Sequence, residues 1–249
     1  MRESSTASPA SSRPIDQRFR PPVKGIDLAQ ALNYLDLAAT DVSFIYDHYT
    51  SAQLFYEAGR RPELEAVAKK ACAGCSTAME KAQVLATFVA EEVPWAGFYE
   101  KQTGEKLPGD RGLSEEEIIK VGYGWCNEQA RLFCCLTQVV GICSRLVFAS
   151  NKVKKYGHVV CEVFLDREWM MVDQSMGYLF AIDGQPVRAV DVFGAKRCRA
   201  HFEPIYRELC KELIAALGRN VAMRYFGMAT ADNPLDVFKD LGFHNHFVS

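Results

Sequence analysis

The sequence has 249 residues, of which 49% are hydrophobic and 24% charged, and its formal net charge at pH 7 is −2. This composition is typical of a globular protein. The near-neutral charge gives no support to nucleic acid or to an anionic membrane surface as a partner. Because no run of about 18 apolar residues is present, we expect no transmembrane helix and no membrane partner.

The N-terminal segment and the cysteine content indicate where in the cell the protein is located. Residues 1–22 are rich in Ser, Pro and Arg and lack an apolar segment, so we expect a disordered leader rather than a secretory signal, with a transit peptide left open. Nine cysteines without an export signal indicate reduced thiols and a cytoplasmic protein. We assign residues 23–249 to a single domain, with a helical segment at 23–75 and a core at about 76–185.

The first half of the chain has mainly helical periodicity. Apolar spacing predicts a helix over 27–59, a break at Gly59–Pro62, and further helices over roughly 63–72 and 76–92. A loop over 101–113 follows. It ends at Ser114, which with Glu117 forms the signature of a capping box at the start of a short helix.

The second half combines one helix, three strands and a helical tail. Apolar positions at helical spacing predict a helix over 126–140 that stops at Gly141. Branched and aromatic runs predict three strands, and helical spacing returns near the C-terminus; the ranges are 145–149, 158–165 and 169–172 for the strands, and 206–217 for the tail helix.

Cys126 lies in a setting that suits a nucleophile. It follows a glycine-containing loop and begins the helix over 126–140, on the same helical face as Ala130 and Phe133. That face must be buried, so the thiol points inward toward a sheet. The positive end of the helix dipole also favours a thiolate at this position.

Strand geometry supplies partners for this thiol. If Asp166 and Arg167 form a two-residue turn, Val160 lies opposite Asp173, and His158 is a diagonal neighbour of Asp173 on the same face. His158 can then accept the thiol proton while Asp173 orients the imidazole. A three-residue turn would place Asp173 on the other face and exclude the triad. Taken singly, such a cysteine or histidine is usually structural, and their co-occurrence carries the prediction.

Two blocks of this sequence resemble the transglutaminase-like superfamily. They are Gly124-Trp-Cys-Asn-Glu-Gln-Ala with the following Gly141-Ile142 and Arg145-Leu-Val, and Gly157-His158-Val-Val-Cys-Glu162-Val with the following Glu168-Trp169-Met-Met-Val-Asp173. The resemblance covers roughly residues 80–180. It implies an α+β fold in which a helix carrying the nucleophile packs on an antiparallel sheet. The helical periodicity before this region adds extra helices on the N-terminal side. It also implies a papain-like thiol enzyme with Cys126 as nucleophile, His158 as base and Asp173 as orienting acid.

Further site residues are weaker predictions. The backbone N–H of Cys126 would form half of an oxyanion hole, and Trp95, which lies 31 positions earlier (126 − 95), could supply an indole N–H. A packed aromatic is the alternative role for Trp95. Trp125 could wall the substrate cleft. Cys72 and Cys75 have the spacing of metal ligands, with Cys198 and His201 as a distant second pair, but one such pair is a weak signal; we expect no metal and no cofactor.

The predicted chemistry is cysteine-dependent acyl transfer on a peptide, a protein, or a small amide or thioester. Water as acceptor makes the chain a peptidase or amidase, and an amine as acceptor makes it an amide-forming enzyme. No calcium-loop pattern is present, which argues against a calcium-dependent crosslinker. Two alternatives stay open: a non-catalytic binding protein of this fold, and an arylamine N-acetyltransferase-like enzyme, whose usual Arg-Gly-Gly is not matched by Gly122-Tyr123-Gly124. The oligomeric state is not indicated.

Overall fold

The computed structural model describes residues 54, 56–107, 113–151, 156–217 and 240–244. Their helices are α3 (Pro62–Ala71), α4 (Ala78–Glu92), α5 (Ala96–Thr103), α6 (Glu115–Val121), α7 (Cys126–Val139), α8 (Ala189–Gly194) and α9 (Lys196–Leu217). Their strands are β1 (Ser144–Asn151), β2 (Tyr156–Leu165), β3 (Glu168–Asp173), β4 (Tyr178–Leu179), β5 (Ala181–Ile182), β6 (Gln185–Pro186) and β7 (Asp240–His244). The fold is therefore α+β.

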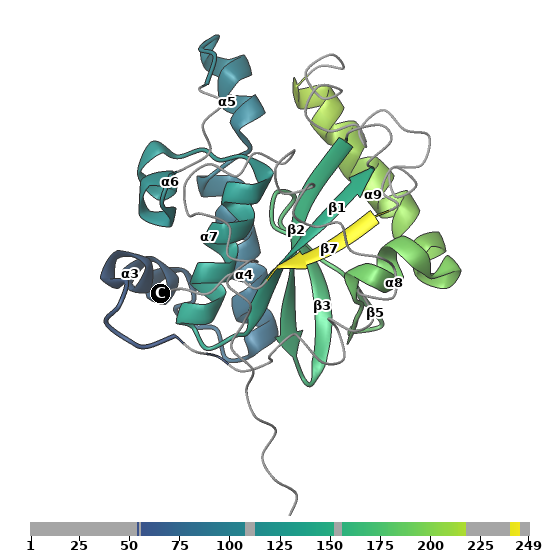
Figure 1. The fold of residues 1–249 in the computed structure, drawn as a ribbon, viewed down its shortest axis with the longest axis horizontal. Coiled ribbons are helices and arrows are strands. Elements are labelled where there is room, and N and C mark those ends of the chain that lie inside the picture. The colour runs from purple at the N-terminus through teal and green to yellow at the C-terminus, as the bar shows by residue number, and fades with distance from the viewer. Residues whose placement is uncertain (1–53, 55, 108–112, 152–155, 218–239, 245–249) are drawn as a thin grey trace, which may run out of the picture.

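A five-stranded antiparallel sheet separates two groups of helices. The strand order is β4-β3-β2-β1-β7, and β5 and β6 form a separate pair. Helices α3, α4, α6 and α7 lie on one side of the sheet, and α8 and α9 lie on the other (Figure 1). Helix α7 packs directly on β1 and β2, which brings its N-terminus to the sheet.

The alternation of side chains along the strands produces two cores. Leu146, Val159, Cys161 and Val172 are buried with the residues of α7, whereas Val147, Val160 and Met171 are buried with residues of α8 and α9. Strands β1 and β3 bury both of their faces because helices cover both sides of the sheet.

The turn between β2 and β3 has the two-residue form that the triad requires. Leu165 pairs with Glu168 across the turn, and the pairing continues to Cys161 opposite Val172. Asp166 and Arg167 have positive φ values of 50° and 70°, as both central residues of a type I′ turn do. The turn type matches the right-handed twist of the strands, which fixes this register.

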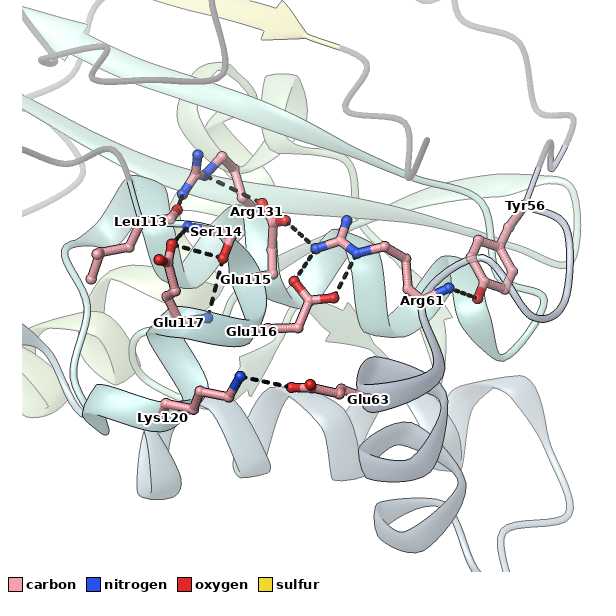
Figure 2. A network of polar contacts seen from close by, with 10 residues as sticks. All are labelled: Tyr56, Arg61, Glu63, Leu113, Ser114, Glu115, Glu116, Glu117, Lys120 and Arg131. Carbon is pink, nitrogen blue, oxygen red and sulfur yellow. Dashed lines mark hydrogen bonds and ion pairs between the residues drawn. The ribbon is translucent and has the colours of Figure 1, made fainter.

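A network of ion pairs joins α3, α6 and α7 (Figure 2). Arg61 donates to Glu116 through Nε at 2.7 Å and to the buried Glu115 through Nη2 at 2.8 Å. Arg131 of α7 lies 3.6 Å from the other oxygen of Glu115 and donates to the carbonyl of Leu113. The network holds α6, the helix that leads into the loop before Cys126, against the rest of this layer.

Most of the predicted elements are confirmed. The helices over 63–72, 76–92 and 126–140, the capping box of Ser114 and Glu117, and the three strands are all present within about two residues of their predicted bounds. The tail helix begins at Lys196, ten positions before the predicted start (206 − 196), because Pro204 is accommodated inside α9. Helices α5 and α8 and the short strands β4, β5 and β6 were not predicted.

Of the predicted N-terminal leader and first helix, the structure describes only the last residues of the helix. Tyr56–Gly59 form a loop and turn, so the predicted helix over 27–59 does not reach its expected end. The rest of that helix and the predicted leader over 1–22 lie outside the described residues. Among the described helices, none is both long and apolar enough to cross a bilayer.

Candidate active site

Cys126 is placed by the loop between α6 and α7. Gly122 ends α6 with a φ of 72°, the left-handed conformation that suits glycine at a helix C-terminus. Gly124 then forms a short parallel bridge with Trp95: its N–H donates to the Pro94 carbonyl at 3.2 Å, and its carbonyl accepts from the Ala96 N–H at 2.8 Å. The two anchored glycines hold the loop so that Cys126 becomes the first residue of α7.

The Cys126 side chain is oriented inward, as predicted. It is 8% exposed and belongs to the same buried cluster as Ala130 and Phe133 of α7. The N–H groups of the first helical turn point toward this end of α7, and together with the helix dipole they favour negative charge there. The small exposed fraction is the only part of Cys126 that solvent or a substrate can reach in this conformation.

His158 and Asp173 form a buried pair across β2 and β3. His158 Nε2 lies 2.9 Å from Asp173 Oδ2, and the two side chains are 2% and 0% exposed. The strand register brings them together: the last paired residues are Cys161 and Val172, and extending that register by one position sets Val160 against Asp173, which makes His158 the diagonal neighbour. The predicted geometry of the pair is thus present.

The two groups stabilise each other's charged forms. Burial by itself would lower the pKa of His158, but the Asp173 carboxylate, with hydrogen bonds to Asp173 and Cys126, raises that pKa to about 10. Burial by itself would raise the pKa of Asp173, but His158, with hydrogen bonds from His158, Tyr206 and the Ser175 N–H, lowers it. At neutral pH the pair is therefore imidazolium and carboxylate.

The Cys126 thiol reaches His158 although the two residues belong to opposite sides of the sheet. His158 shares the parity of Val160, which faces α8 and α9, whereas Cys126 lies in the α7 core. The thiol is nevertheless close enough to the His158 ring to help raise its pKa. The approach is possible because the pairing of β3 with β2 stops at Cys161, two residues short of Val159. The edge of β2 at Val159 is therefore open to the N-terminal end of α7, where Cys126 lies.

Gln174 occupies the place that β3 vacates. It is fully buried, and its Nε2 donates to the Val159 carbonyl at 2.9 Å and to the Cys126 carbonyl at 3.2 Å. The side chain thus supplies a hydrogen that a strand would otherwise donate to β2, and it ties that strand to the first residue of α7. Sequence reasoning did not identify Gln174, although its position directly after Asp173 offered a signal.

Asp173 accepts hydrogen bonds at both of its oxygens. Oδ1 accepts from the backbone N–H groups of Ser175 and Met176, at 3.1 and 3.3 Å. Oδ2 accepts from His158 and from the hydroxyl of Tyr206, a fully buried residue of α9. Tyr206 was also missed, and no sequence signal could have found it, because nothing in the helical tail marks one tyrosine as facing the site.

Trp95 and Trp125 lie beside the loop that carries Cys126. Their rings meet edge to face with centroids 5.8 Å apart, and they are 3% and 6% exposed. A side chain on Gly97 would collide with the Trp95 ring, since its Cβ would lie 2.1 Å from Cζ3. Trp95 is therefore packed tightly beside the site, and either ring could contact a substrate only through a small exposed edge.

A second buried ion pair lies on the same face of the sheet. Arg145 of β1 donates to Glu162 of β2 through Nε at 2.7 Å, its Nη2 lies 2.6 Å from the same carboxylate oxygen, and both side chains are 0% exposed. The Arg145 guanidinium lies 4.0 Å from the centre of the Trp169 ring, and Glu162 also accepts from the Ala189 N–H at 2.7 Å. This pair fastens the start of α8 to the sheet, and α8 leads into α9.

The cysteines outside the site are reduced in this structure. Cys72 and Cys75 lie side by side at the end of α3, where burial raises the pKa of Cys72. Within the described residues, no three or more His, Cys, Asp and Glu side chains gather where they could hold one metal ion.

Comparison with known proteins identifies the core of the chain. The model of the transglutaminase-like superfamily matches residues 65–174, a segment that contains Cys126, His158 and Asp173. No curated protein matches the chain.

Three solved structures resemble the chain at low identity. A proposed cysteine protease of Cytophaga hutchinsonii is 17% identical with a TM-score of 0.37, and the match covers 65% of this chain and 48% of that one. A proposed protease of Parabacteroides distasonis is 13% identical with a TM-score of 0.35, covering 52% and 29%. A protein described as a TGase is 18% identical with a TM-score of 0.34, covering 66% and 42%.

The match thus spans less than half the length of each of these structures, and their low TM-scores say nothing about activity. The family match is the informative comparison: the core of the chain, at residues 65–174, is similar to the transglutaminase-like superfamily.

Proposed function

We propose that the chain is a cysteine-dependent acyl-transfer enzyme in which Cys126 is the nucleophile, His158 the general acid and base, and Asp173 the residue that orients and charges the imidazole. One observation carries the proposal: the buried pair of His158 and Asp173, with Nε2 2.9 Å from Oδ2, lies beside the Cys126 thiol at the start of α7, close enough for that thiol to help raise the pKa of His158. A thiol beside a buried imidazolium and at a helix N-terminus is the arrangement in which a thiolate is stabilised.

The first half of the reaction forms a thioester. The thiolate of Cys126 attacks the carbonyl carbon of an amide or thioester, a carbon–sulfur bond forms, and the carbonyl oxygen takes up the negative charge. When the carbon–nitrogen or carbon–sulfur bond of the substrate breaks, the His158 imidazolium gives its proton to the departing amine or thiol. The acyl group stays on Cys126.

The second half transfers the acyl group to water or to an amine. The neutral His158 accepts a proton from the attacking water or amine, which bonds to the thioester carbon. The carbon–sulfur bond to Cys126 then breaks, and the thiolate and imidazolium are restored. Peptides, proteins, and small amides or thioesters all fit this chemistry, and the choice of acceptor decides between hydrolysis and amide formation.

The charge on the carbonyl oxygen needs hydrogen-bond donors. The backbone N–H of Cys126, at the first position of α7, is one such donor. We assign the second to the indole N–H of Trp95, which the Gly124 bridge and the Trp125 ring hold beside the nucleophile loop. Trp125 would contribute a wall of the cleft.

The test measures the reactivity of each thiol in the folded chain. Iodoacetamide at about pH 7 should alkylate Cys126 at least about tenfold faster than Cys75 and Cys198, although these two are more exposed than Cys126. Mass spectrometry of the peptides gives the rate constant for each cysteine. The His158→Gln variant should reduce the rate at Cys126 to the level of the other thiols.

Trapping of the intermediate extends the test to catalysis. Wild-type protein mixed with an acyl thioester should gain the mass of the acyl group on Cys126, and Cys126→Ala should gain none. If Cys126 is alkylated no faster than Cys75 and Cys198, the proposal that Cys126 is a catalytic nucleophile is wrong.

A further inference from the structure

Tyr206 connects the C-terminal helix to the proposed triad. Its hydroxyl donates to Oδ2 of Asp173, the same oxygen that lies 2.9 Å from His158 Nε2. Tyr206 is fully buried and lies 32 positions beyond the end of the family match (206 − 174). The contact therefore comes from a part of the chain outside the matched core.

The contact is held by packing from more than one element. The Tyr206 ring lies 5.9 Å from that of Phe180, and Phe180 also contacts Phe202, one turn earlier on α9, at 4.9 Å. The start of α8, which precedes α9, is fastened to β2 by the hydrogen bond from Ala189 to Glu162. The hydroxyl is thus presented to Asp173 by the buried face of an anchored helix.

Few groups near Asp173 can change charge in the accessible pH range. Burial, reinforced by Asp173, raises the pKa of Cys210 to about 12, and burial raises the pKa of Tyr206 and of Cys161 well above their ordinary values. These three groups are therefore neutral below about pH 10. Among the described residues beside Asp173, the charge that can respond is that of the pair itself, Asp173 on β3 and His158 on β2, with Cys126 of α7 next to His158.

A neutral donor on Oδ2 alters how strongly Asp173 holds the His158 proton. A hydrogen bond to a carboxylate withdraws part of its negative charge, so the facing imidazolium is stabilised less. An imidazolium that is held less tightly releases its proton more readily to a leaving group, as acyl transfer requires.

Building on the proposed function, we propose that Tyr206 is a positioning residue that tunes the proton affinity of His158 through Asp173. It touches neither the substrate nor the reacting atoms. Its hydroxyl donates a hydrogen bond to the Asp173 carboxylate and so weakens the interaction of that carboxylate with the imidazolium. The strength of this interaction sets the pH range over which His158 carries its proton.

The experiment is the pH dependence of alkylation at Cys126 in the full chain, measured with iodoacetamide from about pH 5 to about pH 11. The rate constant should show an upper inflection where His158 loses its proton. In Tyr206→Phe, this inflection should move upward by about 0.5 to 1 pH unit, because Asp173 then has one donor fewer on Oδ2. A residue that only fills space would leave the inflection in place.

Tyr178→Phe is the matched control. The Tyr178 ring also packs against Phe180, at 4.9 Å, but its hydroxyl is not among the described donors to Asp173. The control should keep the wild-type inflection. Site-specific 3-fluorotyrosine at position 206 retains the ring and hydroxyl but is a stronger donor, so it should move the inflection downward, and it tests the proposal even if Tyr206→Phe does not fold.

The outcomes separate this inference from the proposed function. An upward shift for Tyr206→Phe or a downward shift for fluorotyrosine, with none for Tyr178→Phe, supports it. An unchanged or reversed inflection, or an equal shift in Tyr178→Phe, overturns it while leaving a fast-reacting Cys126 intact. If Cys126 in the wild-type chain reacts no faster than the other thiols, the proposed function fails first.

Discussion

Replacing Gln174 with leucine tests whether its side chain holds the nucleophile against the sheet. The change keeps most of the buried volume and removes the two hydrogen bonds to the carbonyls of Val159 and Cys126, together with a longer one, at 3.4 Å, to the hydroxyl of Ser175. Losing two buried hydrogen bonds costs about 2–4 kcal/mol. The variant also loses Gln174 Oε1, a buried acceptor with no hydrogen-bond partner among the described residues. Removing this unfavourable buried atom offsets about 1 kcal/mol of the destabilisation. We therefore expect Gln174→Leu to lower the free energy of unfolding by about 1–3 kcal/mol.

Urea unfolding followed by tryptophan fluorescence measures this loss. The same samples should show slower alkylation of Cys126 at about pH 7, because the first residue of α7 is then no longer tied to β2. Gln138→Leu is the control: Gln138 is buried near the other end of α7, where it donates to Ser144. That variant should lose stability without slowing Cys126. If Gln174→Leu unfolds at the wild-type urea concentration and labels at the wild-type rate, Gln174 does not position the nucleophile.

Three further changes probe other parts of the structure. Glu162→Gln should lower the free energy of unfolding by about 3–5 kcal/mol, since it leaves Arg145 buried beside a neutral amide; the double variant Arg145→Met, Glu162→Leu should recover most of the loss in urea unfolding, and a double variant as unstable as the single one would contradict this. The pKa of His158 is raised in the folded state to about 10, so its contribution to stability is complete below the unfolded value of about 6.5 and is lost as pH rises through 10, with a slope of at most about 1.4 kcal/mol per pH unit. His158→Gln should flatten that dependence in unfolding experiments at several pH values, and an equally steep curve would refute the assignment. Gly97→Ala should lower the free energy of unfolding by about 1–3 kcal/mol because its Cβ overlaps the Trp95 ring, and an unchanged melting temperature with unchanged tryptophan fluorescence would show that the ring is free to move.

The sequence alone determined the features that depend on neighbouring residues. The capping box of Ser114 and Glu117, the periodicity of α7 and its end before Gly141 are encoded within a few positions. The most informative feature was the turn at Asp166 and Arg167, because its length sets the strand register and the register sets which side chains face one another. From this turn alone, His158 and Asp173 could be placed side by side, and the structure has them 2.9 Å apart.

Only the tertiary structure decided how these local pieces meet. The sequence did not indicate that His158 and Asp173 face α8 and α9 while Cys126 lies in the α7 core, or that the thiol reaches the imidazole where β3 leaves β2. Gln174 contacts Cys126, which lies 48 positions earlier in the sequence, and Tyr206 contacts Asp173, which lies 33 positions earlier. Such contacts depend on how whole helices pack on the sheet, and hydrophobic packing of this kind is non-directional. Local hydrogen bonds and side-chain alternation therefore predicted the His158–Asp173 pair, and packing over long distances supplied the residues that surround it.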